Sequence, residues 1–194
     1  MASLTPIRVT ERAQKLAQEI LHPGDIAIDA TAGKGRDAAF LAQCVGSTGH
    51  VHAFDIQTVA MDASRNLLTI AGLINRVTLH LRSHAEIKEA LPVEQHGRVG
   101  AVLFNLGYLP GGSTSIITQP LSTAKALQAA RVELRAGGRI VCVSYTGHPG
   151  GEQESDIVKQ FADQCEKSGD EVQRLGLDPN PGRPWVLTVT RPLA

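Results

Sequence analysis

Aromatic residues and an excess of charge of either sign are both missing from this sequence of 194 residues. Phe, Trp and Tyr together account for only 4% of it, too few for the rows of stacking rings that hold single-stranded nucleic acids. Lys and Arg number 19, as do Asp and Glu, so the formal net charge is +0. This balance excludes a polybasic nucleic-acid binder. It still allows a local basic patch, which is enough to recognise a small RNA element.

Cysteines and long apolar runs are also scarce. Cys44, Cys142 and Cys165 lie far apart and form no Cys-x-x-Cys pair, so we expect reduced, mostly buried thiols in a reducing compartment. The first twenty residues contain several charges and no apolar run, and no later segment approaches the length that spans a membrane. The sequence therefore predicts a cytoplasmic protein without a membrane segment.

Segments with strand and helix periodicity alternate along the chain. We expect strands at residues 25–30, 51–54, 77–81, 99–106, 139–145, 171–177 and 185–190. We expect helices at residues 9–20, 36–45, 57–71, 86–91 and 152–167, and another that ends at 134. This order predicts a Rossmann-like α/β fold, a seven-stranded, mostly parallel sheet with one antiparallel strand and helices on both faces. Residues 1–194 are predicted to form a single domain, with a helix from residues 1–22 packed on it.

Gly33 and Gly35 lie in a turn between the first strand and the next helix. Such a turn brings backbone amides close to a ligand, although a tight turn without a ligand has the same pattern. Asp55 ends the second strand, twenty positions after Gly35, where a carboxylate would meet ribose hydroxyls. Both features follow carboxyl ends of strands, where open α/β sheets bind ligands. A nucleoside cofactor is the predicted ligand.

Asp29 discriminates between two cofactors that suit this spacing. The pyrophosphate of NAD would lie beside it, and two like charges about 4 Å apart repel by a few kcal/mol near a protein surface. S-adenosylmethionine has no phosphate and presents an ammonium and a sulfonium group, which a carboxylate suits. The sequence therefore favours S-adenosylmethionine, and an NAD-dependent reductase is the alternative from a different enzyme class.

Asn105-Leu106-Gly107-Tyr108 begins at the end of the fourth strand and resembles the Asn-Pro-Pro-Tyr motif of amino methyltransferases, with two substitutions in the middle. An Asn oxygen can accept hydrogen bonds from an attacking NH2 and point its lone pair at a sulfonium methyl, and a ring can pack on a planar substrate. The alternative is that the Asn caps a strand and the Tyr covers the sheet edge. His148, in a glycine-rich loop after the fifth strand, is a candidate to remove a proton from an ammonium acceptor, or else to bind substrate or cap its turn.

Together these segments resemble the bacterial MnmM/YtqB family of class I methyltransferases, also labelled rRNA methylases, over nearly the whole chain. The most specific segments are residues 105–112 and 145–151, the second followed by Glu154. The resemblance implies methylation of the amine of 5-aminomethyl-(2-thio)uridine at wobble position 34 of tRNA, giving 5-methylaminomethyl-(2-thio)uridine. Lys34 and Arg36 stand where we expect Asn and His in this family.

The resemblance also implies roles for individual residues. S-adenosyl-L-methionine would be bound by Asp29, Thr31, Gly33, Gly35, Asp37, Asp55, Ile56, Gln57, Ser83, His84 and Asn105. Asn105, Tyr108 and His148 would be catalytic, and Tyr108, Tyr145 and His148 would bind substrate. The implied partner is the anticodon loop of tRNA, bound by a homodimer without a metal ion.

Other interpretations stay open at this point. A methyltransferase of this type could act on ribosomal RNA, a protein amide or a small metabolite. A catalytically silent RNA-binding protein is a third possibility, against which Asn105 and Tyr108 argue.

Histidines and arginines outside these motifs give weaker signals. His50 and His52 share one strand face without a third ligand at a suitable spacing, so we expect no metal site. Arg131, Arg135 and Arg139 lie near one sheet edge and, together with Arg8, Arg12 and Lys15, are candidates for phosphate contacts, although exposed charges are usually only solvated.

Overall fold

The computed structural model describes residues 8–107, 117–177 and 182–193. They form a seven-stranded sheet in the order β3-β2-β1-β4-β5-β7-β6. The strands are β1 (Ile26–Asp29), β2 (His50–Asp55), β3 (Val77–Leu81), β4 (Val99–Asn105), β5 (Leu134–Ser144), β6 (Glu171–Leu175) and β7 (Trp185–Thr190). The α-helices are α1 (Val9–Gln18), α2 (Arg36–Cys44), α3 (Thr58–Ile70), α4 (Ile87–Ala90), α5 (Pro120–Glu133) and α6 (Gly151–Lys167). Short 3-10 helices are η1 (Ile74–Arg76), η2 (His84–Glu86) and η3 (Val93–Gln95).

Strands β1 to β5 pair in parallel, whereas β7 runs antiparallel to both of its neighbours, β5 and β6. Helices or helical turns connect the first five strands, and such crossovers join parallel neighbours. No helix separates β6 from β7 in the described part of their connection, and they pair as antiparallel neighbours. The predicted sheet with one antiparallel strand is confirmed.

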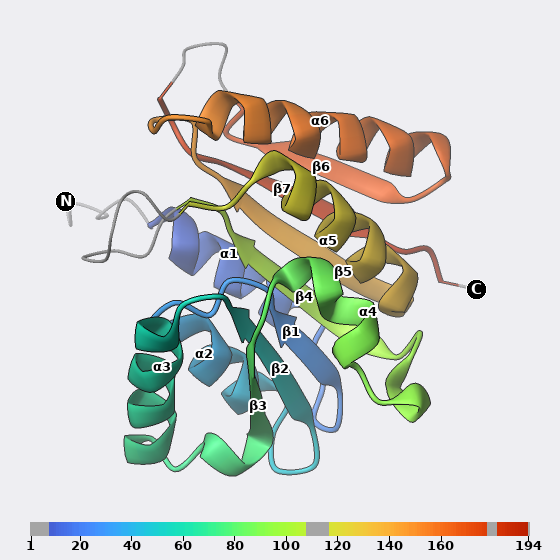
Figure 1. The fold of residues 1–194 in the computed structure, drawn as a ribbon. Coiled ribbons are helices and arrows are strands. Elements are labelled where there is room, and N and C mark those ends of the chain that lie inside the picture. Colours follow the sequence, from blue (N-terminus) through green and yellow to red (C-terminus); the bar gives the residue numbers. More distant parts are fainter. Residues whose placement is uncertain (1–7, 108–116, 178–181, 194) are drawn as a thin grey trace, which may run out of the picture.

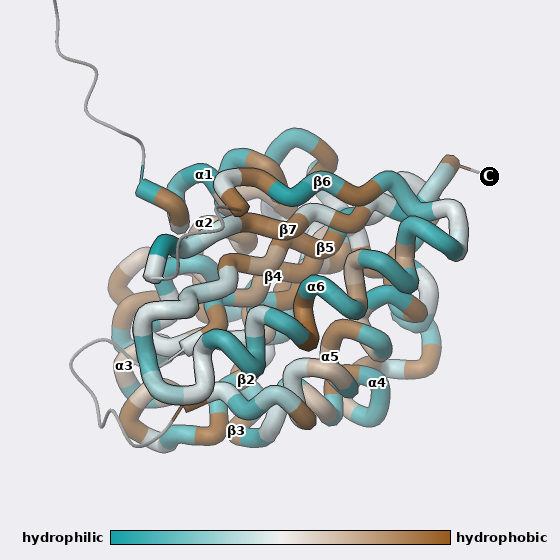
Figure 2. The backbone as a smooth tube through the Cα atoms, turned by 90° about the horizontal axis from the view of Figure 1, so that it is seen from above, coloured by the Kyte–Doolittle hydropathy of each residue, from teal (hydrophilic) through white to brown (hydrophobic). Residues whose placement is uncertain are grey.

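Helices cover both faces of the sheet, as expected (Figure 1). On one face, α1, α2 and α3 pack through residues such as Ala17, Leu41 and Leu68. On the other, α4, α5 and α6 pack through residues that include Leu127 and Phe161. Figure 2 shows the apolar strands β4, β5 and β7 in the middle, surrounded by helices with many hydrophilic residues. Every residue of β4 except its last is buried, which explains its continuous apolar sequence.

Strand β5 begins at Leu134, five positions before the predicted start. The segment 136–138, which lies between the expected end of a helix at 134 and the expected start of a strand at 139, is an irregular part of this strand. The pairing of β5 with β4 jumps there, from Leu134 opposite Val99 to Arg139 opposite Ala101. Gly137 has a φ of +69°, a conformation that glycine adopts readily. The extra residues on β5 therefore form a bulge.

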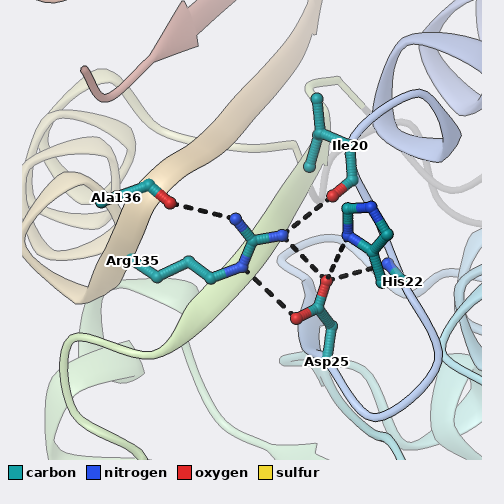
Figure 3. A network of polar contacts seen from close by, with 5 residues as sticks. All are labelled: Ile20, His22, Asp25, Arg135 and Ala136. Carbon is teal, nitrogen blue, oxygen red and sulfur yellow. Dashed lines mark hydrogen bonds and ion pairs between the residues drawn. The ribbon is translucent and has the colours of Figure 1, made fainter. Parts of the chain in front are cut away.

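Three of the residues proposed as phosphate contacts, the arginines of α5 and β5, bind carboxylates of the fold instead. Arg131 pairs with Asp170, and Arg135 donates to both carboxylate oxygens of Asp25 at 3.3 and 2.9 Å. Figure 3 shows that the Arg135 guanidinium also donates to the Ile20 carbonyl, at 2.9 Å.

Arg139, farther along β5, donates to the Leu16 carbonyl and to Glu19, at 2.9 and 2.8 Å. Together, Arg135 and Arg139 hold the carboxyl end of α1 and the segment that follows it against the start of β5. They lie at the sheet edge opposite the carboxyl ends of the parallel strands.

None of the helices within the described ranges is both long enough and apolar enough to cross a membrane.

Candidate active site

A cavity of about 720 Å³ opens at the carboxyl ends of the parallel strands. Its walls bring together most of the site residues expected from the sequence: Thr31, Gly33, Asp37, Asp55, Ile56, Gln57, Ser83, His84, Asn105, Tyr145 and His148. Asp29 and Gly35 do not line the cavity and lie behind residues that do. Tyr108 lies outside the described residues. The binding and catalytic roles expected of these residues remain predictions.

The glycine turn between β1 and α2 packs directly against α3. Gly35 has a φ of +78°, and a Cβ atom placed on it would lie 2.8 Å from the Cα atom of Ser64. The Ser64 hydroxyl donates to the Gly33 carbonyl at 3.0 Å. A side chain at Gly35 would therefore be strained and would also collide with backbone, so the glycine serves this close approach of turn and helix.

Asp55, at the end of β2, holds the glycine turn from the other side. Its Oδ2 accepts from the Gly33 amide and its Oδ1 from the Gln57 amide, each at 3.0 Å. Each carboxylate oxygen can accept a second hydrogen bond. The side chain of Ile56 beside it is 59% exposed and lines the cavity. The pair offers acceptors for a ribose diol next to an apolar surface for a flat ring.

Asp29 is completely buried at the end of β1. Its Oδ1 accepts from the Thr31 amide at 3.1 Å, whereas its Oδ2 has no hydrogen-bond partner among the described residues. Burial, together with the nearby charge of Asp37, raises the pKa of Asp29 well above its usual value. An unmatched acidic group of this kind is stabilised by a cationic ligand, because a positive charge favours the ionised carboxylate.

Asn105 ends β4 beside the glycine turn. Its amide nitrogen donates to the Thr31 hydroxyl at 2.7 Å, and its side-chain NH2 donates to Oδ2 of Asp37. Its Oδ1 is buried and accepts no hydrogen bond from the residues that the structure describes. Leaving a buried acceptor unsatisfied costs about 1–3 kcal/mol. This unsatisfied oxygen belongs to a side chain that lines the cavity, so it is a candidate acceptor for a donor on a ligand.

The base of the loop that follows β4 is fixed by hydrogen bonds. The Gly107 amide donates to the Thr118 hydroxyl at 2.9 Å, and the Thr118 amide donates back to the Gly107 carbonyl at 2.8 Å. The two carboxylate oxygens of the buried Glu154 accept from the hydroxyls of Thr118 and Thr123, at 2.6 and 2.5 Å. Glu154, which follows one of the most specific motif segments, thus anchors one end of this loop to α6.

His84 and Ser83 form the wall after β3. Nδ1 of the buried His84 lies 3.1 Å from the Ala30 carbonyl, so this nitrogen is the donor. Burial lowers the pKa of His84, which favours a neutral ring whose Nε2 is an acceptor. The Ser83 hydroxyl accepts from the Ala85 amide at 3.2 Å and caps η2.

Tyr145 and His148 lie on the wall that follows β5. Tyr145 is half-buried, and burial and the negative charge of Asp37 raise its pKa. Nδ1 of His148 lies 3.1 Å from the Pro149 carbonyl. A Cβ atom on Gly107 would lie 3.6 Å from Nε2 of His148, so the histidine packs close to the loop that begins at Gly107.

Sequence reasoning missed several lining residues: Thr10, Gln14, Arg82, Thr118, Gln119 and Ser122. Thr10 and Gln14 extend from α1, where they lie four positions apart and thus on one helix face. The buried alanines on either side, Ala13 and Ala17, show which side of α1 faces the sheet. The signal available in the sequence was Gln14, a polar residue between the alanines at positions 13 and 17.

His50 and His52 belong to a row of rings on β2 and β3. The rings of His52 and His80 stack at 5.2 Å, and those of His80 and Phe54 stack at 4.5 Å. His52 Nδ1 lies 3.0 Å from His80 Nε2, and its other nitrogen lies 2.7 Å from Gln95 Oε1. In the part of the chain that the structure describes, no three His, Cys, Asp or Glu side chains are grouped to hold a metal ion.

Comparisons with known proteins agree on one family. The family profile described as "Putative rRNA methylase" matches residues 51–190. A relative from Arabidopsis thaliana, "tRNA (mnm(5)s(2)U34)-methyltransferase, chloroplastic", is 40% identical over 162 residues. That match covers 79% of this chain and 58% of the relative, so the chain spans little more than half the length of this curated protein.

Two crystal structures are similar over nearly their whole length. The "putative rRNA-methylase" of Clostridium thermocellum is 35% identical with a TM-score of 0.88, and the match covers 96% of this chain and 99% of that one. "A putative methyltransferase" of Streptococcus mutans, in complex with SAH, is 29% identical with a TM-score of 0.82, again covering 96% and 99%.

Proposed function

Because the chain belongs to the family described as "Putative rRNA methylase", we propose that it is an S-adenosylmethionine-dependent methyltransferase acting on an amine of RNA. The family resemblance inferred from the sequence motifs is confirmed, and the class I methyltransferase fold is confirmed with it. The proposed substrate is the amine of 5-aminomethyl-(2-thio)uridine at wobble position 34 of tRNA, and the product is 5-methylaminomethyl-(2-thio)uridine.

The observation that carries this proposal is the side chain of Asn105. Its buried Oδ1 has no partner among the described residues, while its NH2 is bound to Asp37. An oxygen held in this way accepts a hydrogen bond from an incoming NH2 and orients the nitrogen lone pair. An amine acceptor satisfies Oδ1 with one N–H and keeps its nitrogen lone pair free for the methyl group.

The cavity also suits the cofactor. The Asp55 carboxylate, which accepts from the Gly33 amide, fits a ribose diol. Asp37 and Asp55 lie close enough to Asp29 that the negative charge of each raises its pKa. S-adenosylmethionine supplies a methyl group on a sulfonium, and its two cationic groups would offset this acidity. The pyrophosphate of NAD would add negative charge at the same place, so the reductase alternative is disfavoured. The Streptococcus mutans structure with SAH supports the same conclusion.

The tRNA substrate is supported by the name of the Arabidopsis relative and by charges at the cavity. Lys34, Arg36 and Arg82 are part of its lining. Arg82 comes within 3.9 Å of Glu86, but both side chains are about half exposed, so this ion pair contributes little. The three cations supply a local basic rim in a protein without net charge. Such a rim suits the backbone of a short loop whose base is turned outward into a pocket.

The substrate is tested with purified enzyme, labelled methyl donor and two tRNA preparations. tRNA that carries the aminomethyl group is expected to accept label, and the same tRNA with unmodified uridine at position 34 is expected to accept none. Mass spectrometry of the digested product should identify the methylaminomethyl nucleoside. Label in ribosomal RNA but never in aminomethylated tRNA would contradict the substrate and leave the methyltransferase intact.

Arg82→Ala is expected to raise the KM for tRNA several-fold and to leave the affinity for S-adenosylmethionine unchanged. The affinity for tRNA falls as the salt concentration rises, and loss of one phosphate contact makes the plot of log affinity against log salt concentration less steep by about one. The loss of tRNA affinity should be similar for tRNAs with and without 2-thiolation, since a contact with phosphate does not depend on the identity of the base. The matched control is Arg98→Ala, an exposed arginine before β4 at the far edge of the sheet. An unchanged salt slope for Arg82→Ala would contradict the basic rim.

Three further parts of this proposal concern the protein as a whole. We expect residues 1–194 to act as one domain, two copies to form a homodimer, and the protein to work in the cytoplasm. The cysteines support a reducing compartment, because Cys142 and Cys165 are free and buried and Cys44 is free and partly buried.

A further inference from the structure

The carboxylate of Asp37 binds two side-chain amides that come from distant parts of the chain. Gln14, on α1, donates its Nε2–H to Oδ1 at 2.7 Å, and Asn105, at the end of β4, donates its Nδ2–H to Oδ2. The three side chains form a continuous chain of hydrogen bonds from the N-terminal helix to Asn105, the residue proposed to orient the acceptor. Both Gln14 and Asp37 line the same cavity.

The order of donors and acceptors in this chain fixes how Asn105 is oriented. An ionised carboxylate only accepts hydrogen bonds, so both amides must turn their NH2 groups toward Asp37. Oδ1 of Asn105 must then point away from Asp37. If Asp37 were protonated it could donate, and the Asn105 amide could turn over. The NH2 group would then occupy the position where an acceptor amine needs an oxygen.

Gln14 favours the ionised form of Asp37. Burial raises the pKa of Asp37, and the hydrogen bonds from Gln14 and Asn105 lower it, as does the charge of Arg36. Removing the Gln14 donor therefore removes one of the contacts that keep Asp37 ionised. Among the described residues, Asp29 and Tyr145 are titratable groups that also face Asp37, and both respond to its charge.

The packing of α1 fixes the position from which Gln14 donates to Asp37. Ala13 and Ala17 of the helix are buried against the sheet on both sides of Gln14. Arg135 and Arg139 bind the carbonyls at the carboxyl end of α1 and just beyond it. The helix is thus anchored at its carboxyl end, and Thr10 and Gln14, which precede the anchored residues, line the cavity.

We propose that Gln14 is a positioning residue of the methyl-transfer site, which acts through Asp37 to keep Oδ1 of Asn105 directed at the acceptor amine. This role makes α1, which precedes the part of the chain matched by the family profile, a component of the active site. The proposal rests on the proposed function for its kinetic consequences, but the orientation of Asn105 can be measured without any substrate.

The kinetic test compares Gln14→Leu and Gln14→Glu with Gln18→Leu and Gln18→Glu, which alter an exposed glutamine on the same helix. Gln14→Leu is expected to lower the single-turnover rate about tenfold, with the affinity for S-adenosylmethionine changed less than twofold. A protonated Glu at position 14 can still donate to Asp37, whereas an ionised one cannot and repels it. The rate of Gln14→Glu relative to the wild type should therefore fall as the pH rises from 6 to 9.

The orientation test uses nuclear magnetic resonance of the side-chain amide of Asn105, assigned by its disappearance in Asn105→Ala. This NH2 should be protected from hydrogen exchange in the wild type and several-fold less protected in Gln14→Leu. Equal protection in both proteins would overturn the proposal, as would Gln14 variants with the rates and pH profiles of the Gln18 controls. A wild-type enzyme that methylates no tRNA would overturn the proposed function, and the exchange result would still decide the role of Gln14.

Discussion

Replacing Asn105 with alanine is expected to slow methyl transfer about a hundredfold in single-turnover measurements, because orientation of the attacking nitrogen is lost. The affinity for S-adenosylmethionine should stay within a few-fold of the wild type. An interaction made only with the reacting acceptor lowers the rate without changing cofactor binding. The substitution removes Oδ1, the buried acceptor without a described partner, and also the donor to Asp37.

The control for this variant is Asn66→Ala, which truncates an exposed asparagine on α3 away from the cavity. It should have the rate of the wild type, since alanine is a good helix former. Calorimetric titration with S-adenosylmethionine shows whether each variant still binds the cofactor. A normal single-turnover rate for Asn105→Ala would mean that the residue only ends the strand and caps its turn.

Asp55→Ala is expected to weaken binding of S-adenosylmethionine a hundredfold or more. Two hydrogen bonds from ribose hydroxyls to a charged carboxylate contribute roughly 1.5–3 kcal/mol each, and about 1.4 kcal/mol corresponds to a factor of ten. The geometry adds a second cause. The amides of Gly33 and Gln57 both lose their acceptor in this variant, so the glycine turn is no longer held in place.

Asp55→Asn and Asp62→Ala separate these two causes. Asparagine keeps one oxygen for a backbone amide, so Asp55→Asn should keep more of the thermal stability than Asp55→Ala while still losing affinity. Asp62, exposed on α3, supplies a truncation that should change neither property. Affinity near the wild-type value in Asp55→Ala would show that the carboxylate only holds the turn. Binding of NADH without binding of S-adenosylmethionine would contradict the cofactor itself.

The sheet and the location of the cavity follow from local patterns in the sequence. Apolar runs indicate strands, and the alternation of strands with helices indicates parallel pairing. Parallel strands place their carboxyl ends along one edge. Asp55 and Asn105, each at the end of a predicted strand, are therefore expected to lie at the same edge from sequence alone. The predicted start of β5 at 139 was five positions late because the glycine pair at 137–138 is typical of a turn and of a bulge alike.

The contacts between side chains could not be predicted in this way. The hydrogen bonds from Gln14 and Asn105 to Asp37 join residues 23 and 68 positions apart, and the bond from Arg135 to Asp25 joins residues 110 apart. Such pairs depend on how two elements pack. From its charge alone, Arg135 was a candidate for a phosphate contact. In the structure its guanidinium binds Asp25 and the Ile20 carbonyl and so fixes the segment that follows α1.

The place of α1 has a practical consequence for attaching this protein to other molecules. Thr10, in the first turn of that helix, lines the cavity, so a label attached to this turn would lie beside the site. At the other end of the chain, the Arg191 amide donates to the Gly138 carbonyl near the start of β5. That position lies at the opposite edge of the sheet. Affinity tags, fluorophores and surface linkers for binding assays therefore belong on the carboxyl end of the chain. In that position they leave the cavity open to a bulky tRNA.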